Sequence, residues 1–331
     1  MSDEHKNEPG NQWLSPHEAY EIRIATASTM DDASGFALYL YNTTQHLATQ
    51  RHSHPFSMEL RRVHTKQTVA LLRADHDDEE AVSLPHAPFG GLEFAEEVPH
   101  EVLCYLISTI EDYCRTQQLS KMTVRLPPAS YDSKGFAVQE KVYEDQGYSV
   151  VNSLINHHIP VDDTPFIDRI HPSERKRLRK CQRAGFEAEK WDNPDPSKVF
   201  SFLAESRKRQ GYALSLDLEQ LQSLLAQLPD KAKVFVVKDG EEIISLTVAI
   251  RVNQRILYNF CPADNLDYRA FSPTVLLNKA LYEYAQNEGV ELIDLGVSLD
   301  HLGNEKASLI CFKENLGGHP SAKLTYQKIF E

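Results

Sequence analysis

Apolar and polar residues recur along the chain with two different periods, so the sequence predicts a protein that mixes strands and helices. In the first half, alternation with a period of two residues predicts strands at 21–25, 58–63, 68–73, 81–84, 121–126 and 149–159. Asp31 and Asp32 precede apolar residues, a pattern that predicts a helix running through Tyr41. A helix that begins at Pro99 and another over 135–148 complete this half.

The second half shows the same mixture of periods. Helices are predicted at 172–184, 198–210, 216–228, 273–288 and 305–316. Strands are predicted at 186–191, 233–238, 243–252, 255–260, 291–295 and 322–330. Asp239 and Gly240 form a typical hairpin turn, so the strands between 233 and 260 are expected to form an antiparallel meander.

The stretch 255–296 reads as a strand, a short loop, a capped helix and a strand. Ser272 is placed to cap the helix, Pro273 fits its first position, and Gly289 fits its end. The free N–H groups at the start of such a helix can bind an anion such as a phosphate. The alternative is an ordinary capped helix that packs on a sheet.

The order strand, Gly/Pro loop, proline-started helix, strand occurs twice, at 81–126 and at 255–295. The helix starts Pro99 and Pro273 are 273 − 99 = 174 residues apart, about half the chain, which suggests two copies of one fold. With a junction near 160–170, the chain is predicted to divide into three parts. These are a disordered tail at 1–18, a first domain at 19–165, and a second domain at 166–331 that includes a basic linker helix at 172–184.

Composition narrows the class of protein. With 331 residues, 41% hydrophobic and 25% charged, the sequence is typical of a soluble globular protein with two cores. The N-terminus is polar and no apolar run approaches a membrane span, so a cytoplasmic protein without a membrane span is expected. Five cysteines without a C-x-x-C pair favour neither disulfides nor zinc, and no metal site is predicted.

Charge is distributed unevenly along the chain. The net charge of −13 makes general nucleic-acid binding a poor fit. Residues 169–183 nevertheless carry seven Lys or Arg against one Glu. On a helix, Arg175, Arg179 and Arg183 would line one side, where an anion would relieve their mutual repulsion. A solvated basic helix that offsets acidic groups elsewhere is the alternative.

Several motifs resemble those of a known family. SERKRLRKCQRAGFE at 173–187, DLGVS at 294–298 and ICFKENLGGHP at 310–320 resemble the second half of FemAB-type acyltransferases, and PFGGLEF at 88–94 resembles a turn of their first half. The order of elements after 172 also resembles that of GNAT-type acyltransferases. The resemblance covers about 20–330 and implies an α+β, mixed α/β fold. It would comprise two tandem GNAT-like domains, each a mainly antiparallel central sheet flanked by helices.

The resemblance implies an enzyme that transfers an acyl group from a thioester or other activated donor, of the acyl-CoA type, to an amine. The acceptor would be a small molecule, a sugar or a peptide, held between the halves, with the donor on the second half. The loop before Ser272 reads PADNLDYRAFSP, which differs from the phosphate loop of acetyl-CoA enzymes. An aminoacyl-tRNA-dependent peptidyltransferase of the cell-wall precursor type therefore stays open, although the net charge does not favour tRNA. A non-catalytic, ligand-binding relative also stays open.

Acyl transfer needs a deprotonated amine, a held acyl donor and help for the oxyanion. The candidate catalytic residues are Asp294, which would orient or deprotonate the amine, and Tyr258, which would protonate the leaving group. The candidate donor-binding residues are Arg269, Ser272, Thr274, Phe260 and Cys261. The candidate residues for the acceptor or an anion are Arg175, Arg179, Lys313, Gly90 and Gly91. For Asp294, Tyr258 and Lys313 the alternatives are a strand-end cap, a core aromatic and a surface lysine, respectively.

Overall fold

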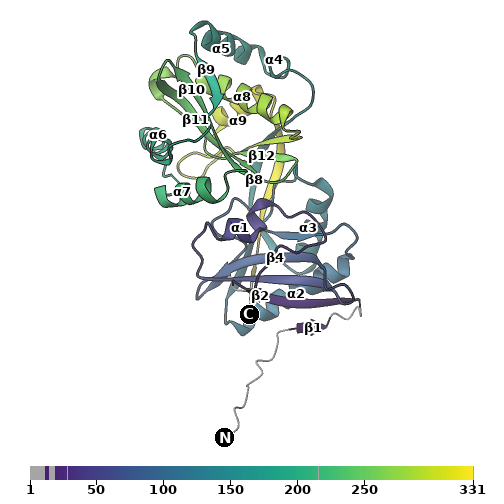
Figure 1. The fold of residues 1–331 in the computed structure, drawn as a ribbon. Helices are drawn as coiled ribbons and strands as arrows, with labels where there is room; N and C mark the ends of the chain where they lie inside the picture. Colours follow the sequence, from purple (N-terminus) through teal and green to yellow (C-terminus); the bar gives the residue numbers. More distant parts are fainter. Residues whose placement is uncertain (1–11, 15–18, 28, 215, 331) are drawn as a thin grey trace.

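The computed structural model describes residues 12–14, 19–27, 29–214 and 216–330. The two halves of the chain lie end to end, with the first half at the bottom of Figure 1 and the second half at the top. Each half contains a mainly antiparallel sheet with helices against it, so the predicted mixed α/β fold class is confirmed. The tail predicted at 1–18 lies outside the described residues, apart from Gln12–Leu14, which pair with the next strand.

The strands of the first half are β1 (Gln12–Leu14), β2 (Tyr20–Thr26), β3 (His54–Arg62), β4 (Thr68–His76), β5 (Glu80–Val82), β6 (Leu92–Phe94), β7 (Lys121–Arg125) and β8 (Ser149–Pro160). Strands β3 and β4, which correspond to the strands predicted at 58–63 and 68–73, form a hairpin. Lys66 lies in its turn with a φ of 58°, the left-handed conformation that such a tight turn demands. Strands β5 and β7 pair in parallel, and the connection between them contains the helix predicted from Pro99.

The helical elements of the first half are η1 (Leu40–Asn42), α1 (Thr44–Leu47), α2 (His100–Thr116) and α3 (Ser133–Asp145). The predicted helix from Asp31 to Tyr41 is wrong, because 31–39 is a non-helical loop that ends in the single turn η1. The buried guanidinium of Arg73 explains the difference. It binds the Asp31 carbonyl oxygen, the Asp32 carboxylate and the Asn42 carbonyl oxygen, an arrangement that holds the segment in an open loop.

The strands of the second half are β9 (Glu187–Lys190), β10 (Ala232–Asp239), β11 (Glu242–Arg251), β12 (Ile256–Asn259), β13 (Ala263–Asp264), β14 (Leu292–Val297) and β15 (His319–Ile329). Its helical elements are α4 (Phe166–Arg169), α5 (Pro172–Arg183), α6 (Pro196–Arg209), α7 (Leu218–Gln227), η2 (Leu266–Tyr268), α8 (Pro273–Asn287) and α9 (Ala307–Asn315). The meander β10–β11–β12 is antiparallel, as predicted. None of the helices in the described ranges combines the length and apolar character needed to cross a membrane.

The parallel pair of the second half is β12 with β14, which aligns Tyr258 with Asp294. Helix α8 connects these two strands, so each half contains one parallel pair joined through a helix. Ser272 occupies the N-cap position of α8 and Pro273 the first turn, as predicted. The Ser272 side chain makes no capping hydrogen bond, however, because this residue adopts a left-handed backbone with a φ of 58°.

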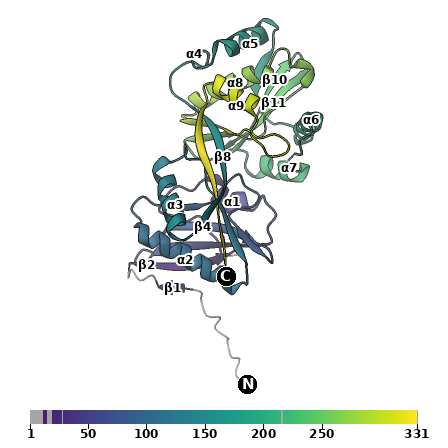
Figure 2. The same ribbon diagram turned by 180° about the vertical axis from the view of Figure 1, so that it is seen from behind.

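The two halves share one continuous sheet, in which the order of strands at the junction is β7-β15-β8-β14. The last strand of the chain, β15, therefore lies between β7 and β8 and pairs with β7 of the first half from Thr325↔Arg125 to Ile329↔Lys121. Figures 1 and 2 show β8 and β15 side by side, running along the long axis from one half into the other.

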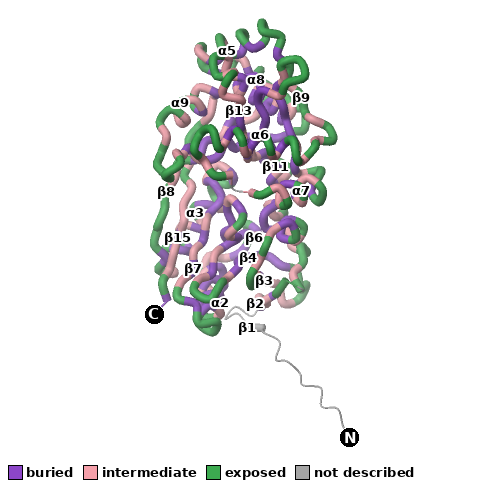
Figure 3. Tube along the Cα trace, turned by 90° about the vertical axis from the view of Figure 1, so that its left-hand side faces the viewer, coloured by how far each residue is buried: buried purple, intermediate pink, exposed green. Residues whose placement is uncertain are grey.

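Three apolar clusters form the core. In Figure 3 the buried residues are the purple segments of the tube. One cluster fills the first half and contains Tyr326 of β15, and another lies around α8 in the second half. The third is built by both halves. It combines Tyr41, Phe89 and Tyr131 of the first half with residues of α6, α7, β10 and β11. The junction between the halves is therefore part of the apolar core.

Candidate active site

A cavity of about 360 Å³ lies at the junction of the two halves. Its wall is formed by Tyr41, His46, Gln50, Pro85, His86, Ala87, Pro88, Arg125, Leu216, Gln220, Leu224, Ile250, Tyr258, Phe260 and Lys323. The first half contributes η1, α1, the loop after β5 and the end of β7, and the second half contributes α7, β11, the end of β12 and β15. A cavity of this size, lined by polar and apolar side chains in similar proportion, fits a small molecule.

Tyr258 and Phe260, two residues predicted for the site, lie in the cavity wall. The pairing of β12 with β14 ends at Tyr258↔Asp294, although β14 continues to Val297. The Tyr258 ring covers Gly296, where a Cβ atom would stand 3.3 Å from the ring. Burial, with the nearby Asp294 carboxylate, raises the pKa of Tyr258 well above its usual value, so its hydroxyl keeps its proton at neutral pH.

Asp294 is buried directly behind this wall and does not line the cavity. Its carboxylate accepts hydrogen bonds from the Tyr131 hydroxyl at 2.7 Å, from Asn156 Nδ2 at 2.7 Å and from the Gly296 N–H at 2.6 Å. These three donors occupy both oxygens. The structure therefore places Asp294 as a hydrogen-bond acceptor that joins Tyr131 of the first half, β8 and β14, and not as a group that lines the cavity.

Lys313 is buried at the end of β14, where its Nζ donates to the carbonyl oxygens of Gly296 and Val297, each at 2.8 Å. Burial lowers the pKa of Lys313 to about 8, an effect that Asp294 opposes. Lys313 therefore holds the bend of β14 and is not the surface lysine of the alternative interpretation. The N–H groups of Phe260 and Cys261, which could meet an acyl carbonyl, both point to the Val248 oxygen instead.

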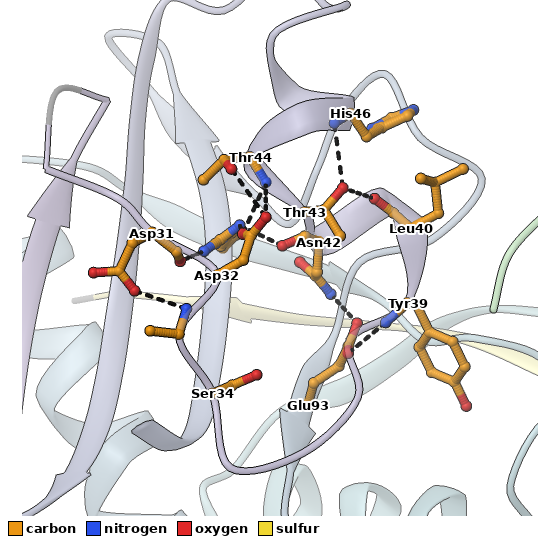
Figure 4. A network of polar contacts seen from close by, with 12 residues as sticks. Asp31, Asp32, Ser34, Tyr39, Leu40, Asn42, Thr43, Thr44, His46 and Glu93 are labelled. Carbon is orange, nitrogen blue, oxygen red and sulfur yellow. Dashed lines mark hydrogen bonds and ion pairs between the residues drawn. The ribbon is translucent and has the colours of Figure 1, made fainter. Parts of the chain in front are cut away.

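Tyr41 and His46 reach the cavity from the segment that Arg73 holds open. In Figure 4, Glu93 accepts hydrogen bonds from the Tyr39 N–H, at 2.9 Å, and from the Asn42 side chain. On the other side of the same segment, the Asp32 carboxylate accepts from the Thr44 N–H at 2.9 Å. Polar contacts thus fix this segment on both sides, through the buried Glu93 on one side and the more exposed Asp32 on the other.

The His46 ring contacts the Tyr41 ring edge-on at 5.0 Å. Burial lowers the pKa of His46 to about 4, so the imidazole is neutral at physiological pH. Its Nδ1 and the Tyr41 hydroxyl are buried without a hydrogen-bond partner in the described part of the chain. Sequence reasoning missed both residues, because Tyr41 fell within the segment predicted as a helix and no motif marked His46.

Two cations, Arg125 and Lys323, also line the cavity and were missed by sequence reasoning. Arg125 closes β7, and its Nη2 donates to the Leu84 carbonyl oxygen at 2.9 Å. Lys323 lies on β15, two residues before Thr325, which is the register partner of Arg125. Residues two apart on a strand share a face, so both side chains belong to the same side of the sheet.

The predicted donor-binding residues are divided between two places. Phe260 faces the cavity and Cys261 is buried beside it, with a pKa raised by burial to about 12, which disfavours a reactive thiolate. Arg269, Ser272 and Thr274 lie instead at the start of α8.

Asp264 lies close to this helix start. It accepts hydrogen bonds from the Ser245 hydroxyl at 2.6 Å and from the Thr274 hydroxyl. A carboxylate near the start of α8 opposes the binding of a phosphate there, since a helix N-terminus attracts one anion most strongly when no other is present.

The predicted anion-binding residues of α5 lie far from the cavity, at the tip of the second half in Figure 1. Arg175 is engaged there, because it donates to the carbonyl oxygens of Ile170 and Asp168. Arg179 is exposed and lies beside Lys176 and Arg183 on a shallow basic surface.

Gly90 and Gly91 follow Pro88 of the cavity wall. A Cβ atom at Gly90 would stand 2.8 Å from Ser83, so this turn needs glycine for close packing. The backbone N–H of Gly90 donates to the Arg125 carbonyl oxygen at 2.9 Å. The two glycines therefore shape the loop beside Arg125.

One group of metal-ligating type, His100, Cys104 and Asp145, occurs among the described residues. It lies on α2 and α3, outside the cavity lining. His100 Nε2 donates to the Asp145 carboxylate at 2.9 Å, and Lys141 donates to the same carboxylate at 2.6 Å, so this carboxylate already has a cationic partner.

Comparison with known proteins supports the resemblance seen in the motifs. Residues 172–306, less than half of the chain, match the family model of the acetyltransferase (GNAT) domain. No functionally curated protein matches the chain by sequence.

Solved structures resemble nearly the whole chain. A crystal structure of FemX matches with a TM-score of 0.67 and 12% identity, covering 88% of this chain and 92% of that chain. A tandem GNAT protein from the clavulanic acid biosynthesis pathway matches with a TM-score of 0.53 and 13% identity, covering 93% of this chain and 98% of that chain. The C-terminal domain of a putative lysylphosphatidylglycerol synthetase from Agrobacterium fabrum matches with a TM-score of 0.53 and 10% identity, covering 78% of this chain and 80% of that chain.

At these identities the structural matches establish the fold. The chain therefore has a tandem GNAT-like fold of the FemAB type, as the motifs indicated.

Proposed function

We propose that this protein is an N-acyltransferase that transfers an acyl group from an activated donor to the amine of a small acceptor bound between its halves. The observation that carries the proposal is the position of Tyr258. Its ring lines the cavity at the point where β12 and β14 stop pairing, in the half that matches the GNAT domain. Burial, together with Asp294 behind the ring, keeps the Tyr258 hydroxyl protonated at neutral pH, so a proton is available for the leaving group.

In the proposed reaction the neutral amine attacks the acyl carbonyl, a C–N bond forms, and the C–S or C–O bond to the leaving group breaks. Tyr258 gives its proton to the leaving thiolate or alkoxide and recovers one from solvent, while the attacking amine gives its extra proton to solvent water, so that no net proton is gained or lost. His46, held neutral on the wall beside Tyr41, can accept a hydrogen bond from the amine. Leu224, Ile250 and Phe260 restrict water on the other side.

The role of Tyr258 is tested by the Tyr258→Phe variant, assayed by release of the leaving group from acetyl-CoA and longer acyl-CoAs with a panel of amines. Loss of the general acid lowers kcat about 10²-fold with little change in KM, because the hydroxyl acts on the transition state. Tyr284→Phe is the matched control, since Tyr284 lies on α8 against Phe235, outside the cavity lining. An unchanged kcat in Tyr258→Phe would remove this residue from the mechanism.

The alternative donor is an aminoacyl-tRNA, which two observations favour. Asp264 opposes a phosphate at the start of α8, and Lys176, Arg179 and Arg183 form an exposed basic surface on α5 that makes no ion pair within the described ranges. If tRNA binds this surface, the logarithm of the binding constant falls linearly with the logarithm of the salt concentration. The Lys176→Gln/Arg179→Gln/Arg183→Gln variant should then reduce the steepness of this dependence by about 2–3. Lys238→Gln, which removes a lysine paired with Glu189, leaves the slope unchanged. Salt-independent or absent tRNA binding, with turnover of acyl-CoA, would reject this donor.

A further inference from the structure

The charge of the cavity wall is opposite to that of the protein. The chain carries 48 acidic and 35 basic side chains, but no Asp or Glu occurs among the described residues that line the cavity. The lining includes two basic side chains, Arg125 and Lys323. This local reversal of charge is the observation that the inference starts from.

Neither cation has a carboxylate partner. Arg125 makes one side-chain hydrogen bond, to the Leu84 carbonyl oxygen, and its Nε is buried without a partner among the residues described. Lys323 makes no side-chain hydrogen bond or ion pair with any described residue, whereas Lys328 of the same strand pairs with Glu111. The carboxylate that acts on Lys323 is Asp294, which opposes the lowering of its pKa, and Asp294 is already engaged by three donors.

The two cations also act on each other. Both are largely shielded from solvent, and burial together with the charge of Arg125 lowers the pKa of Lys323. Two like charges in a shielded site destabilise the protein unless an anion lies between them. An anion that enters the cavity would meet both donors from one side, because Arg125 and Lys323 share a face of the β7–β15 pair.

We propose that Arg125 and Lys323 form an anion-binding subsite, so that the acceptor is an amine that also carries a carboxylate or a phosphate group. The identification of this anion as part of the acceptor rests on the function proposed above. The anionic end would lie against β7 and β15, the amine toward Tyr258, and the apolar part against Leu224 and Phe260. The cavity volume of about 360 Å³ restricts the occupant to a small molecule or the end of a chain.

The subsite is tested by binding, without reference to catalysis. The full chain is titrated with inorganic phosphate, acetate and matched pairs of amines that differ in charge, at constant ionic strength. Two such pairs are alanine against alaninamide and phosphoethanolamine against ethanolamine. The anionic member of at least one pair is expected to bind, its neutral counterpart to bind at least tenfold more weakly, and the pair that responds identifies the carboxylate or the phosphate.

Variants show whether these two residues are responsible. Arg125→Gln and Lys323→Met should weaken binding of the anionic probe roughly ten- to hundredfold. Lys121→Gln should leave it unchanged, because this lysine of the same strand β7 is already paired with Glu80. Without a ligand, Lys323→Met should raise the unfolding midpoint, since it removes an uncompensated charge, whereas a lysine with a structural partner would lower the midpoint when removed.

The results separate the two proposals. Anion binding that depends on Arg125 and Lys323, with no acyl transfer to any amine, supports the subsite and rejects the proposed enzyme function. Acyl transfer to neutral amines that is unaffected by Arg125→Gln and Lys323→Met supports the enzyme and overturns the subsite. If no anionic probe binds the unaltered protein, or if all variants bind equally, the subsite is also overturned.

Discussion

At the scale of single residues, the buried carboxyl of Glu93 links the stability of the cavity wall to pH. It lies at the bottom of the segment in Figure 4, and burial raises its pKa to about 7. A carboxyl whose pKa is higher in the folded state than in the unfolded state holds its proton more tightly when folded. The stabilisation that Glu93 contributes to the free energy of unfolding is complete below the pKa of the unfolded state, near 4.3. This stabilisation is lost as the pH rises through the pKa of the folded state, about 7.

We therefore expect Glu93→Gln to change how stability depends on pH. The free energy of unfolding of the unaltered protein should fall, relative to that of the variant, by up to roughly 3 kcal/mol between pH 5 and pH 8. Glutamine keeps an oxygen for the Tyr39 N–H and cannot ionise. Chemical denaturation at several pH values measures the difference, with the exposed Glu96→Gln as control. Parallel pH profiles for the unaltered protein and Glu93→Gln would contradict the assignment.

At the scale of elements, the sequence predicted most strands and helices but not the segment 31–47. Strands such as β3 and β4 and helices such as α2 and α8 carry their own periodic pattern, so local residues were sufficient. The segment 31–47 owes its conformation to Arg73 and Glu93, which lie on other strands and carry no local signal. For the same reason Tyr258 and Phe260 could be predicted for the site, while Tyr41 and His46 could not.

Arg73→Met tests whether Arg73 determines this element. Its removal takes the guanidinium donor away from the Asp32 carboxylate and from two carbonyl oxygens, and we expect a loss of about 3–5 kcal/mol in the free energy of unfolding. Hydrogen exchange should show that the Thr44 amide, which donates to Asp32, loses protection first. Arg61→Gln on β3 is the control, since Arg61 donates only to the Lys66 carbonyl oxygen of its own turn. Unchanged hydrogen-exchange protection of the Thr44 amide in Arg73→Met would show that the segment 31–47 keeps its conformation without Arg73.

At the scale of the whole molecule, pairing across the junction assembles features that sequence spacing does not reveal. Arg125 and Lys323 are 198 positions apart (323 − 125 = 198) and meet because β15 returns to pair with β7. The alternation in 322–330 predicted a strand there, but no property of the strand itself indicated its partner. The predicted division of the chain at 165/166 likewise did not include this return, which inserts the end of the chain into the first sheet.

Because β8 and β15 belong to the sheet of both halves, we expect the halves to unfold together. Tyr326 of β15 is buried in the core of the first half, where its ring stacks on Tyr143 at 5.4 Å. Tyr326→Ala should lower the free energy of unfolding by about 3–5 kcal/mol, because the substitution leaves a cavity in the core. Although Tyr326 touches only the first half, the β3–β4 and β10–β11 hairpins should lose hydrogen-exchange protection at the same, lowered denaturant concentration. Ile329 lies on the same strand but is 71% exposed, so Ile329→Ala should leave the denaturant concentration at which each hairpin loses protection unchanged. If β3–β4 alone became less stable in Tyr326→Ala, the halves would be independent folding units, and the cavity between them would open without global unfolding.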